Sequence, residues 1–240
     1  MSELLKNNIS TYADLTAYNA DTNKDYPNVS YIYGTDKVKY GTNILVAKYN
    51  VTTTGSATKL LNSTTGISSM TIDGVKQQSV VANYTFSTSG EHIVKYNLVN
   101  QTTISEETFF QCTNLSNIGI PDSVSTISNN AFNASGLTGT LTIPDNVTNI
   151  DYNVFRNCTG LTSIIIGSGV TSINTFVFQS CSNLTNITCL ATTPPTLANK
   201  NAFNDTNNCP IYVPAESVDA YKAATNWSSY ASRIQAIPTT

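Results

Sequence analysis

The sequence predicts a mainly β protein whose central part is a solenoid, and three observations lead to that fold class. Isoleucines recur at one constant interval, at Ile104, Ile127, Ile150 and Ile173. Each is followed by a phenylalanine, a leucine and an alternating apolar pair, which is the pattern of a short strand with one buried face. The composition agrees, because 40% of the residues are hydrophobic and 11% are charged, and Thr, Ser and Asn fill the surface, as in exposed β-rich proteins.

The order of these patterns divides the chain into four parts. We expect an N-terminal anchoring helix and hairpin over residues 1–42, and a small antiparallel β-sandwich over residues 43–100. Residues 101–197 hold the repeats, which form four coils. Each coil has 23 residues, the distance in sequence from Ile104 to Ile127. Residues 198–240 are expected to form an α/β cap on the C-terminal end of the solenoid.

In the first part, a helix is expected over residues 11–20, and two alternating runs around Gly34 predict a β-hairpin. A single hairpin is too small to be stable alone. A partner must therefore cover its large amphipathic side chains, either copies of the same chain or another protein. These side chains are Tyr26, Tyr31, Tyr33 and Tyr40.

In the second part, runs of alternating apolar and polar residues are separated by Gly55, Gly66, Gly74 and Gly90. This spacing predicts a small antiparallel sandwich that seals the first coil of the solenoid. His92 is the only histidine and falls within the last run. We therefore assign it to a strand and give it no chemical role.

In the third part, each coil places its large residues at matching positions. In three coils a cysteine follows the phenylalanine by three residues and a leucine follows it by six, whereas the second coil has lost one residue there and has Ala134 near the cysteine position. Stacking the coils about 4.8 Å apart buries one continuous core. The expected core residues are Phe109, Phe132, Phe155, Phe178, Leu115, Leu137, Leu161 and Leu184, together with Cys112, Cys158 and Cys181, whose thiols we expect to be reduced and metal-free.

In the last part, residues 211–213 predict one more strand, and Pro214 is placed to open a helix. Val218, Tyr221 and Ala224 lie on one stripe of that helix. This stripe is expected to cover the exposed end of the solenoid, together with Trp227, Tyr230 and Ile234.

The motif Phe-x-x-Cys-x-x-Leu-x-x-Ile-x-Ile-Pro-x-x-Val-x-x-Ile, which residues 109–127 match at every named position, resembles the BspA-like leucine-rich repeat family. The resemblance covers residues 104–237. It implies a leucine-rich-repeat solenoid that serves in surface adhesion or recognition without catalysis. Residues 90–96 are similar to the final strand of Ig-like modules, so an Ig-like β module is expected before the repeats.

The N-terminal segment resembles attachment segments of virion proteins in crAss-like and related tailed phages of gut bacteria. The resemblance implies a phage fibre or capsid decoration protein whose anchoring residues are Tyr26, Pro27, Tyr31, Tyr33 and Tyr40. Its partners would be other virion proteins and copies of itself, in a homo-oligomer that is a trimer by analogy with phage fibres.

The start of the sequence has no apolar run of signal-peptide length. We therefore expect a virion protein made in the host cytoplasm. The alternative is a secreted or cell-surface bacterial adhesin whose leader is missing from this sequence.

Composition excludes several function classes. The net charge is −3, and Arg156 is the one cation between Ile104 and Leu197, so we expect no nucleic acid binding. No stretch approaches the roughly 18 apolar residues of a membrane span, so we expect no membrane insertion. A single histidine, cysteines arranged in a line, and the diverging side chains of Glu106 and Glu107 predict neither a catalytic site nor a bound metal or cofactor.

The expected binding face is the outward side of the repeat strands, since their inward residues are committed to the core. Its residues are Asn117, Thr142, Ile165 and Thr188. The expected ligand is a host-surface protein or a glycan. Ile165 is the apolar exception in an otherwise polar row.

Overall fold

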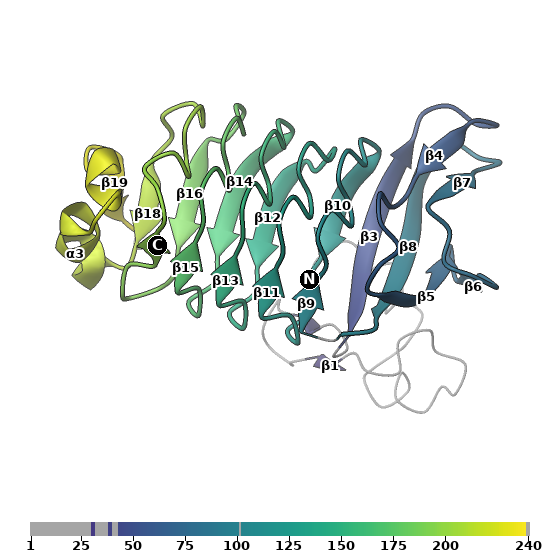
Figure 1. Cartoon of the computed structure of the whole chain (residues 1–240). Helices are drawn as coiled ribbons and strands as arrows, with labels where there is room; N and C mark the ends of the chain where they lie inside the picture. Colours follow the sequence, from purple (N-terminus) through teal and green to yellow (C-terminus); the bar gives the residue numbers. More distant parts are fainter. Residues whose placement is uncertain (1–29, 32–37, 40–42, 101, 239–240) are drawn as a thin grey trace.

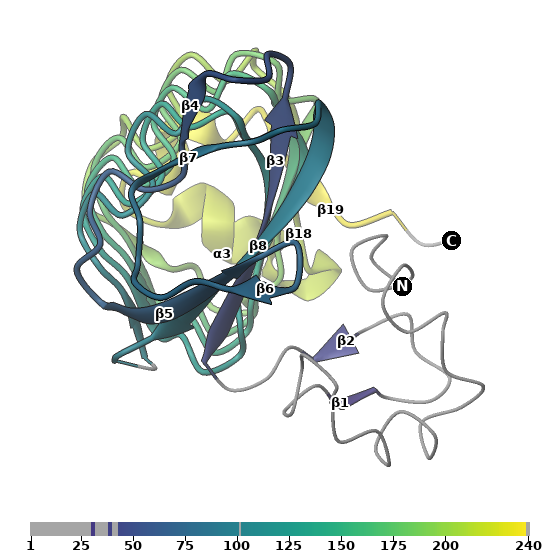
Figure 2. The same ribbon diagram turned by 90° about the vertical axis from the view of Figure 1, so that its right-hand side faces the viewer.

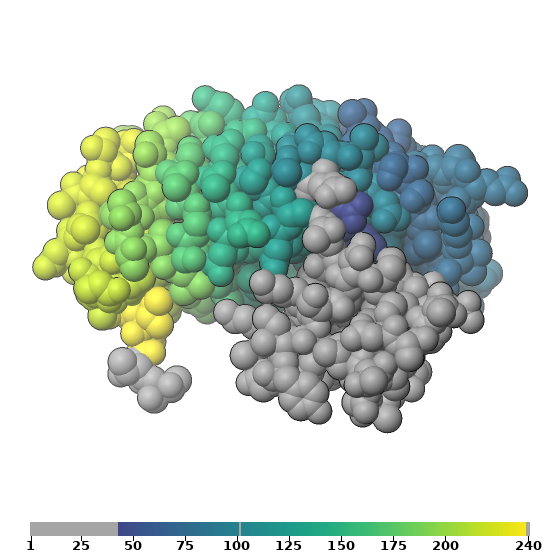
Figure 3. All heavy atoms as spheres, turned by 90° about the horizontal axis from the view of Figure 1, so that it is seen from below, coloured from purple at the N-terminus to yellow at the C-terminus, as the bar shows by residue number. Residues whose placement is uncertain are grey.

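The computed structural model describes residues 30–31, 38–39, 43–100 and 102–238. These residues form an elongated body of stacked coils, with antiparallel strands at one end and helix α3 (Val218–Ala223) at the other (Figure 1). Viewed along the stack, the coils follow one common outline (Figure 2). In the space-filling view the coils appear as consecutive bands (Figure 3). The predicted solenoid is confirmed.

Two parallel sheets form the walls of the solenoid, in the strand orders β17-β15-β13-β11-β9 and β12-β14-β16-β18-β19. In the first wall Ile127 pairs with both Ile104 and Ile150, which is the register that the repeat interval predicts. The strands of this wall are β9 (Thr103–Ile104), β11 (Thr126–Ile127), β13 (Asn149–Ile150), β15 (Ser172–Ile173) and β17 (Thr196–Leu197). The strands of the second wall are β12 (Gly139–Ile143), β14 (Leu161–Ile166), β16 (Asn186–Cys189), β18 (Ile211–Val213) and β19 (Ile234–Ala236).

A ladder of stacked phenylalanine rings runs through the core between the two walls. Phe109, Phe132, Phe155 and Phe178 are all completely buried. Consecutive ring centroids are 5.1, 5.2 and 5.5 Å apart, and the rings are within 9° of parallel. The expected leucines are buried as well. The predicted core is therefore confirmed, and it is continuous because each coil places the same residue over its neighbour.

The array continues for one coil beyond the four expected. Phe203 stacks on Phe178 with the ring centroids 5.5 Å apart, and Leu197 of β17 pairs with Ile173 of β15. Phe203 is therefore the fifth rung of the ladder, although it falls within residues 198–240, where the C-terminal cap is predicted. Irregular spacing explains why the repeat interval does not predict this coil. Leu197 follows Ile173 by 24 residues instead of 23, and Phe203 follows Leu197 by six residues instead of five.

Each of the first four coils turns its corners with left-handed backbone. The residues two positions before and two positions after each ladder phenylalanine have φ between 55° and 61°. Asparagine tolerates this conformation better than other residues with a side chain, whereas alanine and bulky residues are strained in it. Ala134 and Phe176 are therefore strained corners. The complete set is Glu107, Gln111, Asn130, Ala134, Asn153, Asn157, Phe176 and Ser180.

The part before the repeats consists of antiparallel strands in two sheets. The larger sheet contains β3 (Ile44–Val51), β8 (Gly90–Leu98), β5 (Ile67–Ile72) and β6 (Val75–Lys76), and the smaller one pairs β4 (Ala57–Lys59) with β7 (Asn83–Thr85). Leu60, Phe86 and Tyr96 of this part belong to the same buried cluster as the residues of the coils. The Ig-like character of the module stays a prediction.

The larger sheet does not end at the expected boundary near residue 100. Strand β10 (Leu115–Gly119), which belongs to the first coil, pairs antiparallel with β3 as its fifth strand. The register shifts between Leu115 and Asn117, and the amide of Asn50 donates a hydrogen bond to the carbonyl of Asn114 at 2.8 Å. The module and the array thus share a strand, and the parallel wall begins only at β12.

Two buried tyrosines close the core at this joint. The hydroxyl oxygens of Tyr49 and Tyr96 lie 2.8 Å apart, and Tyr49 Oη donates to the carbonyl of Leu60. The ring of Tyr96 meets Phe109 edge-on at 5.4 Å between centroids. Burial raises the pKa of both phenols well above the usual value. The module therefore caps the phenylalanine ladder with aromatic rings that stay neutral.

The C-terminal end is covered by short helices and one more strand. After β18 the chain forms a 3₁₀ turn (Ala215–Ser217), α3, and a second 3₁₀ turn (Trp227–Tyr230). Trp227 and Tyr221 are completely buried; Trp227 Nε1 donates to the carbonyl of Pro195 at 2.7 Å, and Tyr221 Oη to that of Ala191 at 2.8 Å. Ile234, also expected at this end, is buried; it begins β19 and extends the second wall by one strand.

Before the module, β1 (Ser30–Tyr31) pairs antiparallel with β2 (Val38–Lys39). The helix expected over residues 11–20 lies outside the described residues. The same holds for four of the expected anchoring residues, Tyr26, Pro27, Tyr33 and Tyr40. The fifth, Tyr31, lies on β1, opposite Val38.

Candidate recognition face

Three of the four expected face residues lie side by side on the second wall. Thr142 of β12 pairs with Ile165 of β14, and Ile165 pairs with Thr188 of β16. The row continues through Tyr212 of β18 to Gln235 of β19. Five strands therefore present one straight row across the outer side of the wall.

The strand alternation explains why this row faces outward. Leu141 and Ile143, on either side of Thr142, lie in the core, as do Ile164 and Ile166 on either side of Ile165. Successive residues of a strand point to opposite faces. Thr142 is exposed, whereas Ile165 and Thr188 are half-buried.

Asn117 has a different setting from the other three. It lies on β10 and pairs with Lys48 of β3 in the antiparallel sheet, instead of pairing with Thr142. Asn117 occupies the same position in its repeat as Thr142 does in the next one, but the repeat pattern contains no information about pairing with β3. Asn117 therefore marks the border between the recognition face and the module.

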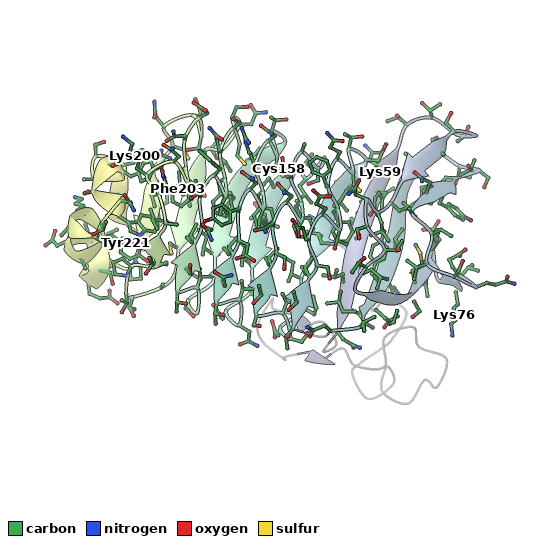
Figure 4. The ribbon with its side chains drawn as sticks, in the orientation of Figure 1. Lys59, Lys76, Cys158, Lys200, Phe203 and Tyr221 are labelled. Atoms are coloured by element: carbon green, nitrogen blue, oxygen red, sulfur yellow. The ribbon has the colours of Figure 1, made fainter. Side chains whose placement is uncertain are left out.

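The row is neutral. From β12 to β19 it contains two threonines, an isoleucine, a tyrosine and a glutamine, and a second row beside it holds Thr140, Ser163 and Asn186. Ser163 Oγ donates to Asn186 Oδ1 at 2.7 Å. The labelled lysines lie elsewhere, Lys59 and Lys76 in the module and Lys200 near the C-terminal end (Figure 4). Hydroxyl and amide groups beside a tyrosine ring and an aliphatic side chain suit a neutral polar ligand.

Tyr212 was missing from the expected face. Its signal is present in the sequence, since Ile211 and Val213 flank it in the same alternation that flanks Thr142. Gln235 has no comparable signal. Its strand follows the helical segment and no repeat interval leads to it.

The cysteines of the coils are packed as free thiols. Cys112, Cys158 and Cys181 are completely buried and unpaired with one another. Cys158 Sγ donates to the carbonyl of Phe132 and Cys181 Sγ to that of Phe155, both at 3.1 Å, so each thiol satisfies a carbonyl of the preceding coil. Figure 4 shows Cys158 inside the array. Burial raises the pKa of Cys158 to about 12, which keeps its thiol protonated.

The second coil uses a serine in place of the cysteine. Ser135, three residues after Phe132, is buried and lies 3.4 Å from Cys158 Sγ. Ala134, which the sequence places near the cysteine position, is its neighbour in the chain. Ser135 itself follows from counting three positions after the ladder phenylalanine.

The remaining polar candidates have structural partners. His92 lies in β8 with Nδ1 2.6 Å from Asp73 Oδ2 and its ring stacked on Phe86. Glu106 and Glu107 lie in a turn, and Glu107 accepts a hydrogen bond from the side-chain amide of Asn62. Within the described ranges, no group of three or more His, Cys, Asp or Glu residues is arranged to hold a metal ion.

An open pocket of about 630 Å³ lies between the fifth coil and the C-terminal segment. It is lined by Asp205, Asn208, Ser229, Arg233 and neighbouring residues. Arg233 Nε donates to the carbonyl of Cys209 and Nη2 donates to Thr206 Oγ1. The guanidinium therefore holds the end of the array together, and the pocket offers no row of groups comparable to that of the second wall.

No helix among the described residues has the length and apolar character needed to span a membrane.

Stacked coils with an inner phenylalanine ladder and a flat outer row of strand residues define a leucine-rich repeat protein. The family model described as BspA type Leucine rich repeat region matches residues 79–210 in six copies. The chain belongs to this family. The match begins inside the module and ends beyond Phe203, so it exceeds the four expected coils on both sides.

Three solved structures are similar to this chain, each over a little more than half of its length. The pneumococcal vaccine antigen PcpA is 23% identical with a TM-score of 0.44, and the match covers 56% of this chain and 32% of PcpA. A leucine rich cell surface protein from Faecalibacterium prausnitzii is 17% identical with a TM-score of 0.29, covering 56% of each chain. A leucine-rich repeat protein from Bacteroides ovatus is 17% identical with a TM-score of 0.24, covering 58% of this chain and 52% of that protein. No curated protein sequence matches the chain.

Proposed function

We propose that this protein is a non-catalytic recognition protein whose ligand, a host-surface protein or a glycan, binds along the outer row of the second wall. The observation that carries the proposal is the continuous neutral row from Thr142 to Gln235. Solenoids commonly bind along such extended surfaces. Thr142 is exposed and the middle of the row is half-buried, so a ligand can contact several strands at once without rearranging the core.

The chemistry of the row favours a glycan among neutral ligands. Threonine hydroxyls and the Gln235 amide supply hydrogen-bond donors and acceptors, and Tyr212 supplies a half-buried aromatic ring. Binding sites typically combine a few placed polar groups with an aromatic or apolar surface. The row has no charged group from β12 to β19 to select an ionic ligand.

The test replaces the four expected face residues together, as Asn117→Lys, Thr142→Lys, Ile165→Lys and Thr188→Lys. The labelled full chain is then measured on intact gut bacterial cells and on a glycan array. We expect binding to fall at least tenfold, because bulky charged side chains would cover the row.

A matched control carries four lysines at outward strand positions of the opposite wall, at Thr103, Thr126, Ser172 and Thr196. Each precedes a buried residue of its strand, so its side chain points outward. The control should bind like the wild type. Unchanged binding of the face variant, or equal loss in both variants, would eliminate this face.

We further propose that the protein is displayed on a phage particle as a fibre or decoration protein anchored through residues 1–42, in a homo-oligomer. The support is the resemblance of the segment around Tyr26 and Pro27 to virion attachment segments. Mass spectrometry of purified particles should find the protein, and light scattering should give a trimer mass. The alternative is a bacterial cell-surface adhesin, favoured by the cell-surface description of the F. prausnitzii neighbour. Recovery in the bacterial envelope and absence from particles would decide for it.

A further inference from the structure

Strand β3 is buried on both of its faces, unlike the strands of the array. Leu45, Ala47 and Tyr49 point inward and belong to the core. Ile44 and Val46 alternate with them and point outward, yet they are only 7% and 1% exposed. The outer side of the module therefore carries an apolar patch that is shielded from solvent.

The patch spreads over the neighbouring strand. In β8, Val94 and Tyr96 belong to the core, so Ile93 and Lys95 between them point outward. Pairing places Ile93 opposite Lys48 and Lys95 opposite Val46. Lys95 is 5% and Lys48 8% exposed, and Lys48 Nζ lies 2.7 Å from Glu91 Oε1, so it is the burial of the lysine stems beside the apolar residues that requires a cover.

The sheet itself does not provide this cover. On the other side of β3, Val46 pairs with Gly119, which has no side chain to lay over it. Among the described elements, those in extensive contact with β3 are β8 and β10, its neighbours within the sheet. Other apolar residues of the module are open to solvent, since Val75 and Val99 are each 66% exposed.

We propose that the outer face of β3 and β8 is a docking surface for the segment of this same chain that precedes β3, residues 1–42. That segment leads directly into β3 at Ile44, so it reaches the patch without a linker. Its paired strands β1 and β2 form a unit that is too small to be stable alone. Four of its six tyrosines, Tyr26, Tyr31, Tyr33 and Tyr40, provide the large amphipathic surface that a patch of isoleucine, valine and lysine stems complements.

The proposal goes beyond the recognition function, because it assigns an occupant to a different part of the outer face. The patch lies next to Asn117, at the border between the module and the recognition row. Docking there makes the N-terminal segment and the module one unit, and it limits the accessible row to the strands from β12 onward.

The test is site-resolved trypsin cleavage of the full chain, with Lys24, Lys37 and Lys39 as reporters within the segment. Val46→Glu places a carboxylate in the patch without adding a trypsin site. We expect cleavage at the reporters to rise at least tenfold. Thr142→Glu, at an exposed outward position of β12, is the matched control and should cleave like the wild type.

A variant that loosened the whole module would also speed cleavage at Lys59 in β4 and Lys76 in β6, which serve as internal references. In that event Val46→Thr tests the docking instead, because it keeps the β-branched shape and replaces one methyl group of the patch by a hydroxyl. It should raise reporter cleavage at least twofold with the references unchanged.

Three outcomes overturn the proposal. The first is that the wild-type reporters are cleaved as fast as the same lysines in a synthetic peptide of residues 1–42. The second is that Val46→Thr leaves reporter cleavage unchanged. In the third, light scattering gives a wild-type dimer that Val46→Thr converts to a monomer with reporter cleavage unaltered, which would make a second copy the occupant.

Discussion

Phe155→Ala tests the phenylalanine ladder at its middle rung. The ring is completely buried, with its centroid 5.2 Å from that of Phe132 and 5.5 Å from that of Phe178. Truncating a buried phenylalanine costs about 3–5 kcal/mol, because apolar area is lost and a cavity remains. Two stacked pairs are lost as well, so the upper half of this range is expected. For a chain of this length a loss of about 4–5 kcal/mol should lower the melting temperature by roughly 8–20 °C.

Urea unfolding followed by tryptophan emission measures this loss directly. Trp227 is the only tryptophan, is completely buried, and contacts the ladder through Phe203 at 5.5 Å between ring centroids. It therefore reports from two rungs away whether the array unfolds as one body. Far-UV circular dichroism should give the same midpoint if it does.

The matched control is Tyr152→Ala, an aromatic residue of the same coil that is 49% exposed. Its cost should stay within about 0.5 kcal/mol, as for other surface substitutions. The reasoning would be refuted by a loss below about 1 kcal/mol for Phe155→Ala, or by equal losses for the two variants. Either result would mean that the ring is not a structural rung of the ladder.

Three further substitutions test packing, backbone strain and titration. Gly136→Ala should destabilise by about 1–3 kcal/mol in urea unfolding, because a Cβ there would lie 1.9 Å from the Thr113 carbonyl oxygen. Ala134→Asn should stabilise by about 0.5–1 kcal/mol, since φ is +55° and Asn157 occupies the equivalent corner of the next coil. Burial raises the pKa of Cys158 from 9.0 to about 12; the unfolded thiol ionises first, so stability present below pH 9 is lost as pH rises towards 12. Cys158→Ser should remove about 2 kcal/mol of this loss between pH 8 and pH 10.5.

Each of these expectations has a result that contradicts it. A neutral Gly136→Ala would mean that the first two coils are not in close backbone contact. A destabilising Ala134→Asn would show that the corner is not strained by its alanine. Identical alkaline profiles for the wild type and Cys158→Ser would show that this thiol is not held in its protonated form by burial.

The repeat core was predictable because its signal is local and regular. One residue type at one interval fixes which side chains stack, so Phe109 to Phe178 followed from counting. The fifth coil escaped because its interval is one place longer and its phenylalanine comes a further place late. Counting at a fixed interval still finds the second coil, because the residue lost between Phe132 and Leu137 is regained before Ile150. It misses the fifth coil, whose total length differs from the interval.

The joint between module and array was not predictable from the sequence. The residues of β10 fit the repeat pattern as well as those of any later coil, yet the strand pairs antiparallel with β3. Strand direction and partner are set by tertiary packing, which leaves no mark in the alternation of one strand. For the same reason the sequence pattern puts Asn117 in one row with Thr142, whereas in the structure it pairs with Lys48 of β3.

The sharing of β10 also determines how the length of this protein can change. At β10 the sheet direction reverses, and β18 leads into the helical C-terminal end, so both ends of the array are closed by strands with special partners. Between the two ends, each coil packs against a similar coil on either side, as β14 does between β12 and β16. A tandem duplication of one coil within this stretch would lengthen the body by about 4.8 Å and add one residue to the outer row. The reach of the row is thus adjustable in single steps by unequal crossing-over, while the two ends of the protein stay as they are.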